Sequence, residues 1–523
     1  MNFDEAIKQL QAAQGDPDQL ALATIDIVLA GREPGLRAAL EAAAIPHWFD
    51  EAILAGLIGA EEARRWLEPL TALSMVEAFP LRQGWNVHEA SRLALRRHLA
   101  ATAPDRLRAL SGLAADCFVG KEPAQRIERL FHRLVAGPDA EAAEELRELY
   151  GDWENEGRHE NLQALAGVLD ETRRDAPLGK SSRAGVLKLL VLIRWDNLPL
   201  PVREDYALAA LKLALGLDDG LACFEAHWTL GMVLLARSKR AEAAGQFLAM
   251  AGIAQARLAQ DADNNDWLRR LSMSYNLNGD LRAAQGDHAG ALEHYQAAHA
   301  IAERLVDLDP ANVLWQRDLS FSHERIGDLL AKQGDRAGVP EHHQAAHAIT
   351  ERLVGLDSAN AQWQRDLAVS HGRVGDLLAI QGDRAGALER YQIGLAIAER
   401  LADLDPANAQ WQRDLAVYHN RIGELLAPQG DRAGALEHYQ AGLAIAERLA
   451  SLDQANTEWQ RDLAVSHWKL AGNAEQAGEP AGALAHYRVS VAIMAKLAAL
   501  DPGHAQWRDD LAWCGEQIRR LEG

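Results

Sequence analysis

Six tryptophans divide the second half of this 523-residue chain into segments of equal length. No insertion breaks the series, which runs with a period of 48 residues through Trp267, Trp315, Trp363, Trp411, Trp459 and Trp507. A fixed period of about 20–50 residues is typical of repeat architectures, in which each unit packs on its neighbours. We therefore expect the second half to be an array of small repeats and not one large globular core.

Each repeat contains two helical patterns separated by a glycine. In the unit that begins at Trp411, apolar residues recur at helical spacings at Trp411, Leu415, Ile422 and Leu426, and again at Leu436, Tyr439, Leu443 and Ala446. Gly430 lies between the patterns, where a residue free to adopt positive φ can end the first helix. Each repeat is therefore predicted to be a helical hairpin. Between units, Asp405 is expected to cap the next helix and Pro406 to occupy its first turn.

This pattern resembles the tetratricopeptide repeat. Small residues stand where the two helices would cross, at Gly279, Gly327, Gly375 and Gly423. In the second helix of each hairpin, alanines are followed four residues later by tyrosines, at Ala291 and Tyr295, Ala387 and Tyr391, Ala435 and Tyr439, and Ala483 and Tyr487. The usual repeat has about 34 residues, so these hairpins are expected to be extended. The resemblance implies an all-α solenoid with a degenerate unit in 220–262, five extended units in 263–506 and a capping helix in 507–523.

The resemblance also implies a binding surface, because the first helix of each hairpin lines the ligand-facing side in that family. One inner position holds Asn276, Glu324, Gly372, Asn420 and Trp468, and the position four residues later holds Asp280, Asp328, Asp376 and Glu424. A row of carboxylates favours a basic or amine-bearing segment. The expected partner-binding residues are Asn276, Asp280, Glu324, Asp328, Asp376, Asn420, Glu424 and Trp468. The alternative is that each acid merely pairs with the arginine three residues before it, at Arg325, Arg373 or Arg421.

The first half is expected to be helical except for one segment. Residues 1–45 predict short helices, and 101–219 predict an array of helical hairpins. In 46–100, helices near 51–58 and 60–73 precede two alternating strands at 75–79 and 85–87 and a further helix. This order resembles the winged-helix module that lies between the nucleotide-binding module and the sensor repeats of STAND-type ATPases. Val87-His88-Glu89 with Arg92 resembles the motif there whose histidine approaches nucleotide. The resemblance implies a regulatory setting, with a separate ATPase or a protease as effector.

A phosphate-binding loop is absent from the sequence. The nearest match is Gly179-Lys180-Ser181, but Arg174 occupies the position of the first glycine and no strand precedes it. We interpret 173–183 as a polar linker. No nucleophile elbow or His-Glu-x-x-His motif occurs either. We therefore expect no enzymatic activity and no cofactor, although a site assembled from unlinked residues stays open as an alternative.

Four histidines occupy one repeat position, at His323, His371, His419 and His467. A metal ion needs ligands that converge at about 2 Å, whereas equivalent atoms of neighbouring repeats lie much farther apart. We therefore favour packed, hydrogen-bonded histidines and expect no metal. His343 and His347 share one helix face, but no third ligand is visible in the sequence.

The net charge is −21, which argues against binding to nucleic acid or to an anionic membrane, because affinity for phosphate depends on lysine and arginine. The first residues, Met1 to Glu5, lack the features of a signal peptide, and Cys117, Cys223 and Cys514 are few and far apart. We expect reduced thiols and a cytoplasmic protein. The sequence thus predicts an interaction protein that binds a peptide or protein segment. The alternative is a transcriptional regulator in which Arg82, Arg92, Arg96 and Arg97 contact DNA phosphates.

Overall fold

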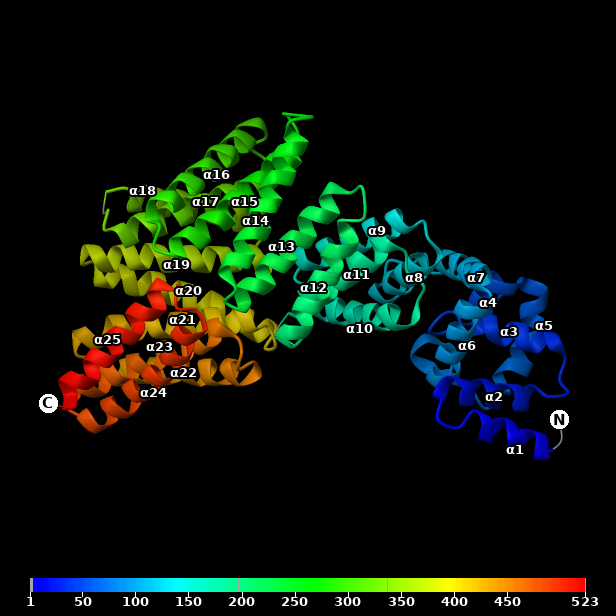
Figure 1. Cartoon of the computed structure of the whole chain (residues 1–523). Helices are drawn as coiled ribbons and strands as arrows, with labels where there is room; N and C mark the ends of the chain where they lie inside the picture. Colours follow the sequence, from blue (N-terminus) through cyan, green and yellow to red (C-terminus); the bar gives the residue numbers. More distant parts are fainter. Residues whose placement is uncertain (1–2, 196, 336, 523) are drawn as a thin grey trace. The chain divides into compact units, whose positions relative to one another are not determined.

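The computed structural model describes residues 3–195, 197–335 and 337–522 (Figure 1). Within these ranges the chain is 81% helical, with 25 α-helices and two strands, so the predicted all-α class is confirmed. The chain forms two compact units. Unit 1 comprises Met1–Glu154, Arg158–Ile193 and Lys212–Leu217, and unit 2 comprises Asn155–Gly157, Arg194–Leu211 and Asp218–Gly523.

The first eleven helices and both strands follow each other along the chain as α1 (Phe3–Ala12), α2 (Pro17–Leu29), α3 (Pro34–Ala43), α4 (Glu51–Ile58), α5 (Ala60–Thr71), β1 (Val76–Phe79), β2 (Gly84–Val87), α6 (Glu89–Thr102), α7 (Pro104–Cys117), α8 (Pro123–Ala136), α9 (Asp139–Asn155), α10 (His159–Asp175) and α11 (Lys180–Ile193). The later helices are α12 (Leu200–Ala214), α13 (Gly220–Ala236), α14 (Arg240–Leu258), α15 (Asn265–Ala284), α16 (His288–Leu308), α17 (Val313–Gln333), α18 (Val339–Leu356), α19 (Ala361–Gln381), α20 (Arg384–Leu404), α21 (Ala409–Leu426), α22 (Arg432–Leu452), α23 (Thr457–Gln476), α24 (Pro480–Leu500) and α25 (Ala505–Glu522).

The strands of unit 1 form an antiparallel hairpin. Val76 pairs with Val87, and Phe79 pairs with Gly84. Phe49, which precedes α4, adds a bridge to Trp85 on the other edge of β2. The order of two helices, hairpin and helix is the one that the sequence predicts for 46–100, and we refer to the hairpin of β1 and β2 as the wing.

In five units, an asparagine three residues before the periodic tryptophan caps the first helix of the hairpin. The side chain of Asn408, for example, accepts a hydrogen bond from the backbone N–H of Trp411 at 3.1 Å. The same bond recurs at Asn264, Asn312, Asn360 and Asn456. The prediction that Asp405 caps this helix is wrong, since Asp405 ends α20 and its carboxylate accepts from Ala407 in the connecting turn.

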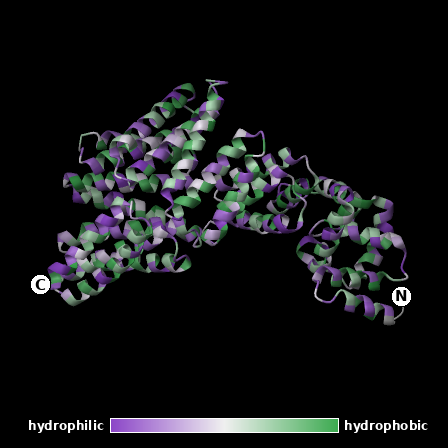
Figure 2. Cartoon of the chain, in the orientation of Figure 1, coloured by the Kyte–Doolittle hydropathy of each residue, from purple (hydrophilic) through white to green (hydrophobic). Residues whose placement is uncertain are grey.

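The hairpins themselves form as the sequence predicts. Gly286, Gly334, Gly382, Gly430 and Gly478 all adopt positive φ between the two helices of a unit. The crossing glycines lie against an aromatic ring of the second helix, so that a Cβ on Gly423 would overlap the ring of Tyr439. Figure 2 shows hydrophobic and hydrophilic residues alternating along these helices, as expected for elements that bury one side.

The array curves with its first helices on the inside. Consecutive first helices of the hairpins, such as α19 and α21, contact one another, and consecutive second helices are farther apart. The curvature also brings early and late parts of unit 2 together. Arg203 of α12 forms an ion pair with Asp453 at 3.1 Å, and Arg240 of α14 forms one with Asp501 at 3.3 Å.

Among the residues that the structure describes, one helix, α24, is long and apolar enough to cross a membrane by length and composition alone. It is the second helix of the last hairpin, and Tyr487, Met494 and Leu497 are buried on it. Core helices pass the same test of length and composition.

One position of the array carries a coupled pair of substitutions. Four units place a serine at Ser274, Ser322, Ser370 and Ser466, whereas the unit between the last two has Tyr418. Tyr418 is 1% exposed, and a Cβ on Gly394 would overlap its ring. We expect Gly394→Ala to lower the free energy of unfolding by about 1–3 kcal/mol through overpacking. Tyr418→Ser removes the ring that the added Cβ would overlap, so the double variant should lose less than the sum of the two single losses, in line with the Ala346 and Ser370 pair of the preceding unit. Thermal unfolding of both single variants and the double variant measures the coupling, and additive losses would contradict it.

Candidate functional site: the inner face of the helical array

The inner face is crossed by two rows of ion pairs that join each unit to the next. In the first row, an arginine two residues after each tryptophan binds the aspartate of the following unit. Its members are Arg269–Asp318, Arg317–Asp366, Arg365–Asp414, Arg413–Asp462 and Arg461–Asp510. In the four units that begin at Trp315, Trp363, Trp411 and Trp459, the adjacent arginine and aspartate therefore bind opposite neighbours, which fixes the spacing between repeats.

The second row contains the predicted acidic residues. Arg325 binds Asp280 at 3.1 Å, and Arg373 binds Asp328 at 2.9 Å. Arg421 and Lys469 contact Asp376 and Glu424 in the same way. The cation in each pair comes from the next unit, 45 residues later, and not from three residues before. The structure thus brings the acidic residues together in a row, but it gives each one a positively charged neighbour.

The second helix of the hairpin also holds three of these acids, Asp280, Asp328 and Asp376. The hydroxyl of Tyr295 donates to Asp280 at 2.7 Å, and that of Tyr391 donates to Asp376 at 2.7 Å. Burial and the neighbouring carboxylate both raise the pKa of these tyrosines. In the unit where a histidine replaces the tyrosine, His343 contacts Asp328 at 3.1 Å. Each of these three aspartates therefore joins both helices of its own hairpin to the next hairpin.

Cavities open between the first helices at three places in the described part of the array. One, of about 320 Å³, lies between α17 and α19 and is lined by Phe321, Glu324, Arg325, Arg365 and Arg373, among others. A second, also of about 320 Å³, lies at the equivalent place between α21 and α23, with Val417, Asn420, Arg421, Arg461 and Lys469 in the corresponding positions. A third, of about 580 Å³, lies between α23 and α25 and is lined by Trp468, Trp513, Tyr439 and Tyr487.

The variable inner position supplies the residue that distinguishes these cavities. It contributes Glu324 to the first, Asn420 to the second and Trp468 to the third. Trp468 lies edge-on to Trp513 with ring centroids 5.6 Å apart. Asn276, at the same position of the first unit, has a buried side-chain oxygen without a hydrogen-bond partner. Gly372 leaves room that Arg421 and Tyr418 occupy.

Glu324 differs electrostatically from the other acids of this face. It is 5% exposed, and its Oε2 lies 3.1 Å from Nη1 of Arg373, whereas its Oε1 has no hydrogen-bond partner. Arg373 is shared with Asp328. Burial raises the pKa of Glu324 to about 7, because the positive charge of Arg373 does not offset the loss of solvent.

The histidines are paired within hairpins. Nδ1 of His323 lies 2.9 Å from Nδ1 of His342, and the same contact joins His419 to His438 at 2.9 Å and His467 to His486 at 3.0 Å. Burial lowers the pKa of His323 to about 4. Sequence reasoning missed the second histidine of each pair, which follows the first by 19 residues in three units. Among the described residues, no group of three or more histidine, cysteine, aspartate or glutamate side chains is placed to hold a metal.

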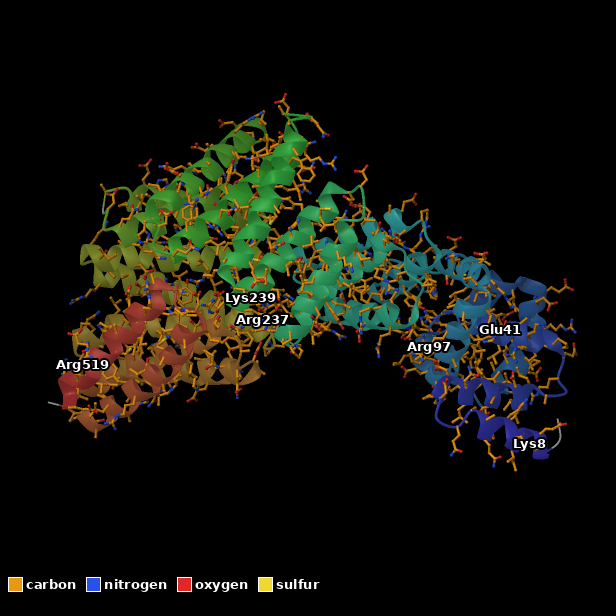
Figure 3. The ribbon with its side chains drawn as sticks, in the orientation of Figure 1. Lys8, Glu41, Arg97, Arg237, Lys239 and Arg519 are labelled. Atoms are coloured by element: carbon orange, nitrogen blue, oxygen red, sulfur yellow. The ribbon has the colours of Figure 1, made fainter. Side chains whose placement is uncertain are left out.

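A buried cluster in unit 1 accounts for most arginines considered for DNA. Arg92 and Arg96 both donate to Glu171, at 2.9 and 2.8 Å, and are 6% and 3% exposed. Arg97, which is labelled in Figure 3, forms ion pairs with Asp175 and Asp18 at the exposed edge of this cluster. These side chains are engaged inside the unit, whereas Arg82 is exposed on the wing.

The segment Gly179-Lys180-Ser181, which resembles a phosphate loop, is bound by a carboxylate from α9. Asp139 accepts hydrogen bonds from the backbone N–H groups of Ser181 and Ser182 at 2.7 and 2.9 Å, at the start of α11. A carboxylate thus occupies the site where a helix N-terminus could bind phosphate. The interpretation of 173–183 as a linker is wrong for most of the segment, since α10 extends to Asp175 and α11 begins at Lys180.

No family model matches the sequence, and no curated protein matches it. Among solved structures, the chain is similar to a STAND protein with a tetratricopeptide repeat sensor, PH0952 from Pyrococcus horikoshii, at 10% identity and a TM-score of 0.46, over 97% of this chain and 72% of that one. It is similar to a Rap protein complexed with competence and sporulation factor, at 13% identity and a TM-score of 0.44, over 72% of this chain and 98% of that one. It is also similar to the human IFIT1 dimer with PPP-AAAA, at 14% identity and a TM-score of 0.38, over 94% of this chain and 99% of that one. At these TM-scores the likeness carries no argument about the function of this chain.

Proposed function

We propose that unit 2 is a non-enzymatic scaffold that captures an extended segment of another protein along the inner face of the array. The observation that carries this proposal is the recurrence of cavities on one face. Those between α17 and α19 and between α21 and α23 lie at equivalent positions two repeats apart, and the third follows at the end of the array. A segment that follows the first helices would meet them in sequence.

The chemistry of the lining supports recognition by side-chain pockets. The ion-pair rows hold the scaffold rigid, and the variable position between them changes from Glu324 to Asn420 to Trp468. Such a surface can discriminate between partners because each cavity offers different chemistry on the same frame. The acidic members of the predicted set, Asp280, Asp328, Asp376 and Glu424, would contribute to a partner site through their exposed edges, and a basic segment is the partner that we propose.

We further propose a regulatory setting for unit 1, with a separate ATPase or protease as effector. The side chains of Arg82, within the wing, and of His88, directly after β2, are exposed, so a partner could reach this part of unit 1. The transcriptional alternative is less favoured, because Arg92 and Arg96 are buried against Glu171.

Photo-crosslinking in the native host tests the proposed surface. A photoreactive phenylalanine analogue at Val417, which lines the second cavity and is 36% exposed, should crosslink the full-length chain to a partner. The same analogue at Leu436, which is 39% exposed on the second helix of that unit, should not.

An ion-pair swap provides the second arm of this experiment. Asp376→Arg with Arg421→Asp keeps the pair but moves its charges, so we expect partner capture to fall at least about tenfold, by the penalty for like charges at an interface. The swap Asp263→Arg with Arg304→Asp, at an exposed pair away from the cavities, is the matched control. Capture that is insensitive to both swaps, or crosslinking from Leu436 equal to that from Val417, would refute the proposal.

A further inference from the structure

We infer that the cavity between α17 and α19 is a specificity pocket for a basic side chain, a lysine or an arginine, whose charged group pairs with the free oxygen of Glu324. This inference rests on the proposed function and names the chemistry of one subsite within it.

The local balance of charge supports a cation. Of the carboxylates that line this cavity, Asp280 has Arg325 as its partner, Asp328 has Arg373, and Asp366 has Arg317. The third lining arginine, Arg365, is bound to Asp414. Asp280 and Asp366 thus each have one cation of their own, whereas Asp328 shares Arg373 with Glu324. Glu324 is left with a share of Arg373, so the cavity holds one carboxylate more than its cations neutralise.

Because Glu324 is buried, the unneutralised carboxylate costs free energy. A carboxylate removed from water is costly unless donors replace its hydration. Glu324 is 5% exposed, and its Oε1 has no donor. An ammonium or guanidinium group that entered the 320 Å³ cavity would supply that donor and neutralise the charge.

The rest of the lining suits the stem of such a side chain. Phe321 and Val369 form apolar parts of the wall, and lysine and arginine carry three or four methylene groups that pack on apolar surface. The cavity between α21 and α23 has the same architecture with neutral Asn420 in place of Glu324. The chain therefore contains its own comparison site, which lacks the extra carboxylate.

Saturation-transfer NMR on the full-length protein tests the inference. The probes are Nα-acetyl-lysine methylamide, Nα-acetyl-arginine methylamide and the uncharged norleucine analogue. We expect one or both charged probes to give at least fivefold larger signals than norleucine, and the probe with the lower saturating concentration identifies the preferred side chain. Glu324→Gln should abolish this difference, whereas Asn420→Gln, the matched change in the second cavity, should leave it intact.

The pH dependence provides a readout that a structural role of Glu324 would not give. The charged groups facing Glu324 are Arg325 and Asp328 from its own helix and Asp366 and Arg373 from α19. Since burial raises the pKa of Glu324 to about 7, its ionised fraction should increase about tenfold between pH 6 and pH 8, and binding of the charged probes should strengthen accordingly.

The outcomes separate this inference from the proposed function. Equal signals from norleucine and the charged probes, or binding unaffected by Glu324→Gln, would overturn the pocket even if the array captures a protein. Charge-selective binding without any crosslinked partner from Val417 would keep the pocket and refute the scaffold. Thermal unfolding of Glu324→Gln verifies that a loss of binding does not come from loss of the fold.

Discussion

Glu171→Ala is expected to lower the free energy of unfolding of unit 1 by about 3–5 kcal/mol, the cost of removing one partner from a buried ion pair. The Glu171 carboxylate accepts hydrogen bonds from Arg92 and Arg96 and contacts His47 at 3.2 Å. Burial alone would raise the pKa of Glu171, but its bonds with His47 and Arg92 outweigh burial and hold the pKa well below its usual range. Alanine would leave two buried guanidinium groups without their anion.

The loss of stability should be largest in the helices that meet at the cluster of Glu171, Arg92 and Arg96. Arg96 also lies over the ring of Phe131 at 4.3 Å, so α6, α8 and α10 meet at this cluster. Hydrogen exchange measured by mass spectrometry on the full-length chain would report unit 1 separately from unit 2. Peptides of α6 and α10 should lose protection, and peptides of α19 and α20 should not.

Two variants make this experiment specific. Glu160→Ala changes an exposed carboxylate on the same helix and should leave exchange unaffected. Glu171→Gln keeps the shape and an acceptor but removes the charge, so it should give an intermediate loss. Unchanged protection in Glu171→Ala would show that solvent or rearranged side chains compensate the two arginines.

The repeat architecture could be predicted because each of its signals is local. Gly430 between two apolar patterns specifies the turn of a hairpin whatever surrounds it, and the constant period implies that all units stack alike. The position of the cap could not be fixed in the same way. Asp405 and Asn408 are both residues that favour a helix start, but in the structure Asp405 follows the end of α20 and Asn408 caps α21.

The connections on the inner face depend on geometry that the sequence of one unit does not contain. Pairing of Asp328 with Arg325 or with Arg373 is decided by the rotation between neighbouring hairpins. The sequence did contain a signal for pairing with Arg373, because the aspartate and the arginine both recur at the period of the array. To predict the histidine pairs, one must likewise know which residues of the two helices of a hairpin face each other. The repeated spacing of 19 residues was the available evidence.

The wing of unit 1 was predictable from alternation in 75–87, whereas the buried cluster was not. Glu171 lies 79 residues after Arg92 in the sequence, and no periodic pattern relates them. The predicted DNA contacts of Arg92 and Arg96 assumed that basic residues after a wing face the solvent. Burial against a distant carboxylate is a tertiary effect, which explains why sequence patterning overestimated their availability.

Glu324→Gln is expected to stabilise the array at neutral pH and to have a much smaller effect in acid. The pKa of Glu324 in the folded chain, about 7, lies above its ordinary value of 4.5. The folded state therefore binds the proton more tightly than the unfolded state, and stability falls as the pH rises from about 4.5 to about 7. This pKa shift corresponds to a loss of about 2–4 kcal/mol in the free energy of unfolding, and the loss is complete above pH 7. Glutamine avoids the cost because it carries no charge to desolvate.

Comparison of variant and parent at each pH isolates this contribution from the histidines. Burial lowers the pKa of His323, His371 and His467 to about 4, so their contribution is lost as the pH falls below about 6.5, which is the opposite direction. These residues are common to both proteins and cancel in the difference. Hydrogen exchange of α17 and α19 peptides should show a stabilisation by Glu324→Gln that grows between pH 5 and pH 8. Glu389→Gln, an exposed change on α20, should show none. A pH-independent difference would mean that Glu324 stays in one protonation state across this range, and the cost of its burial would then have to be met within the cavity itself.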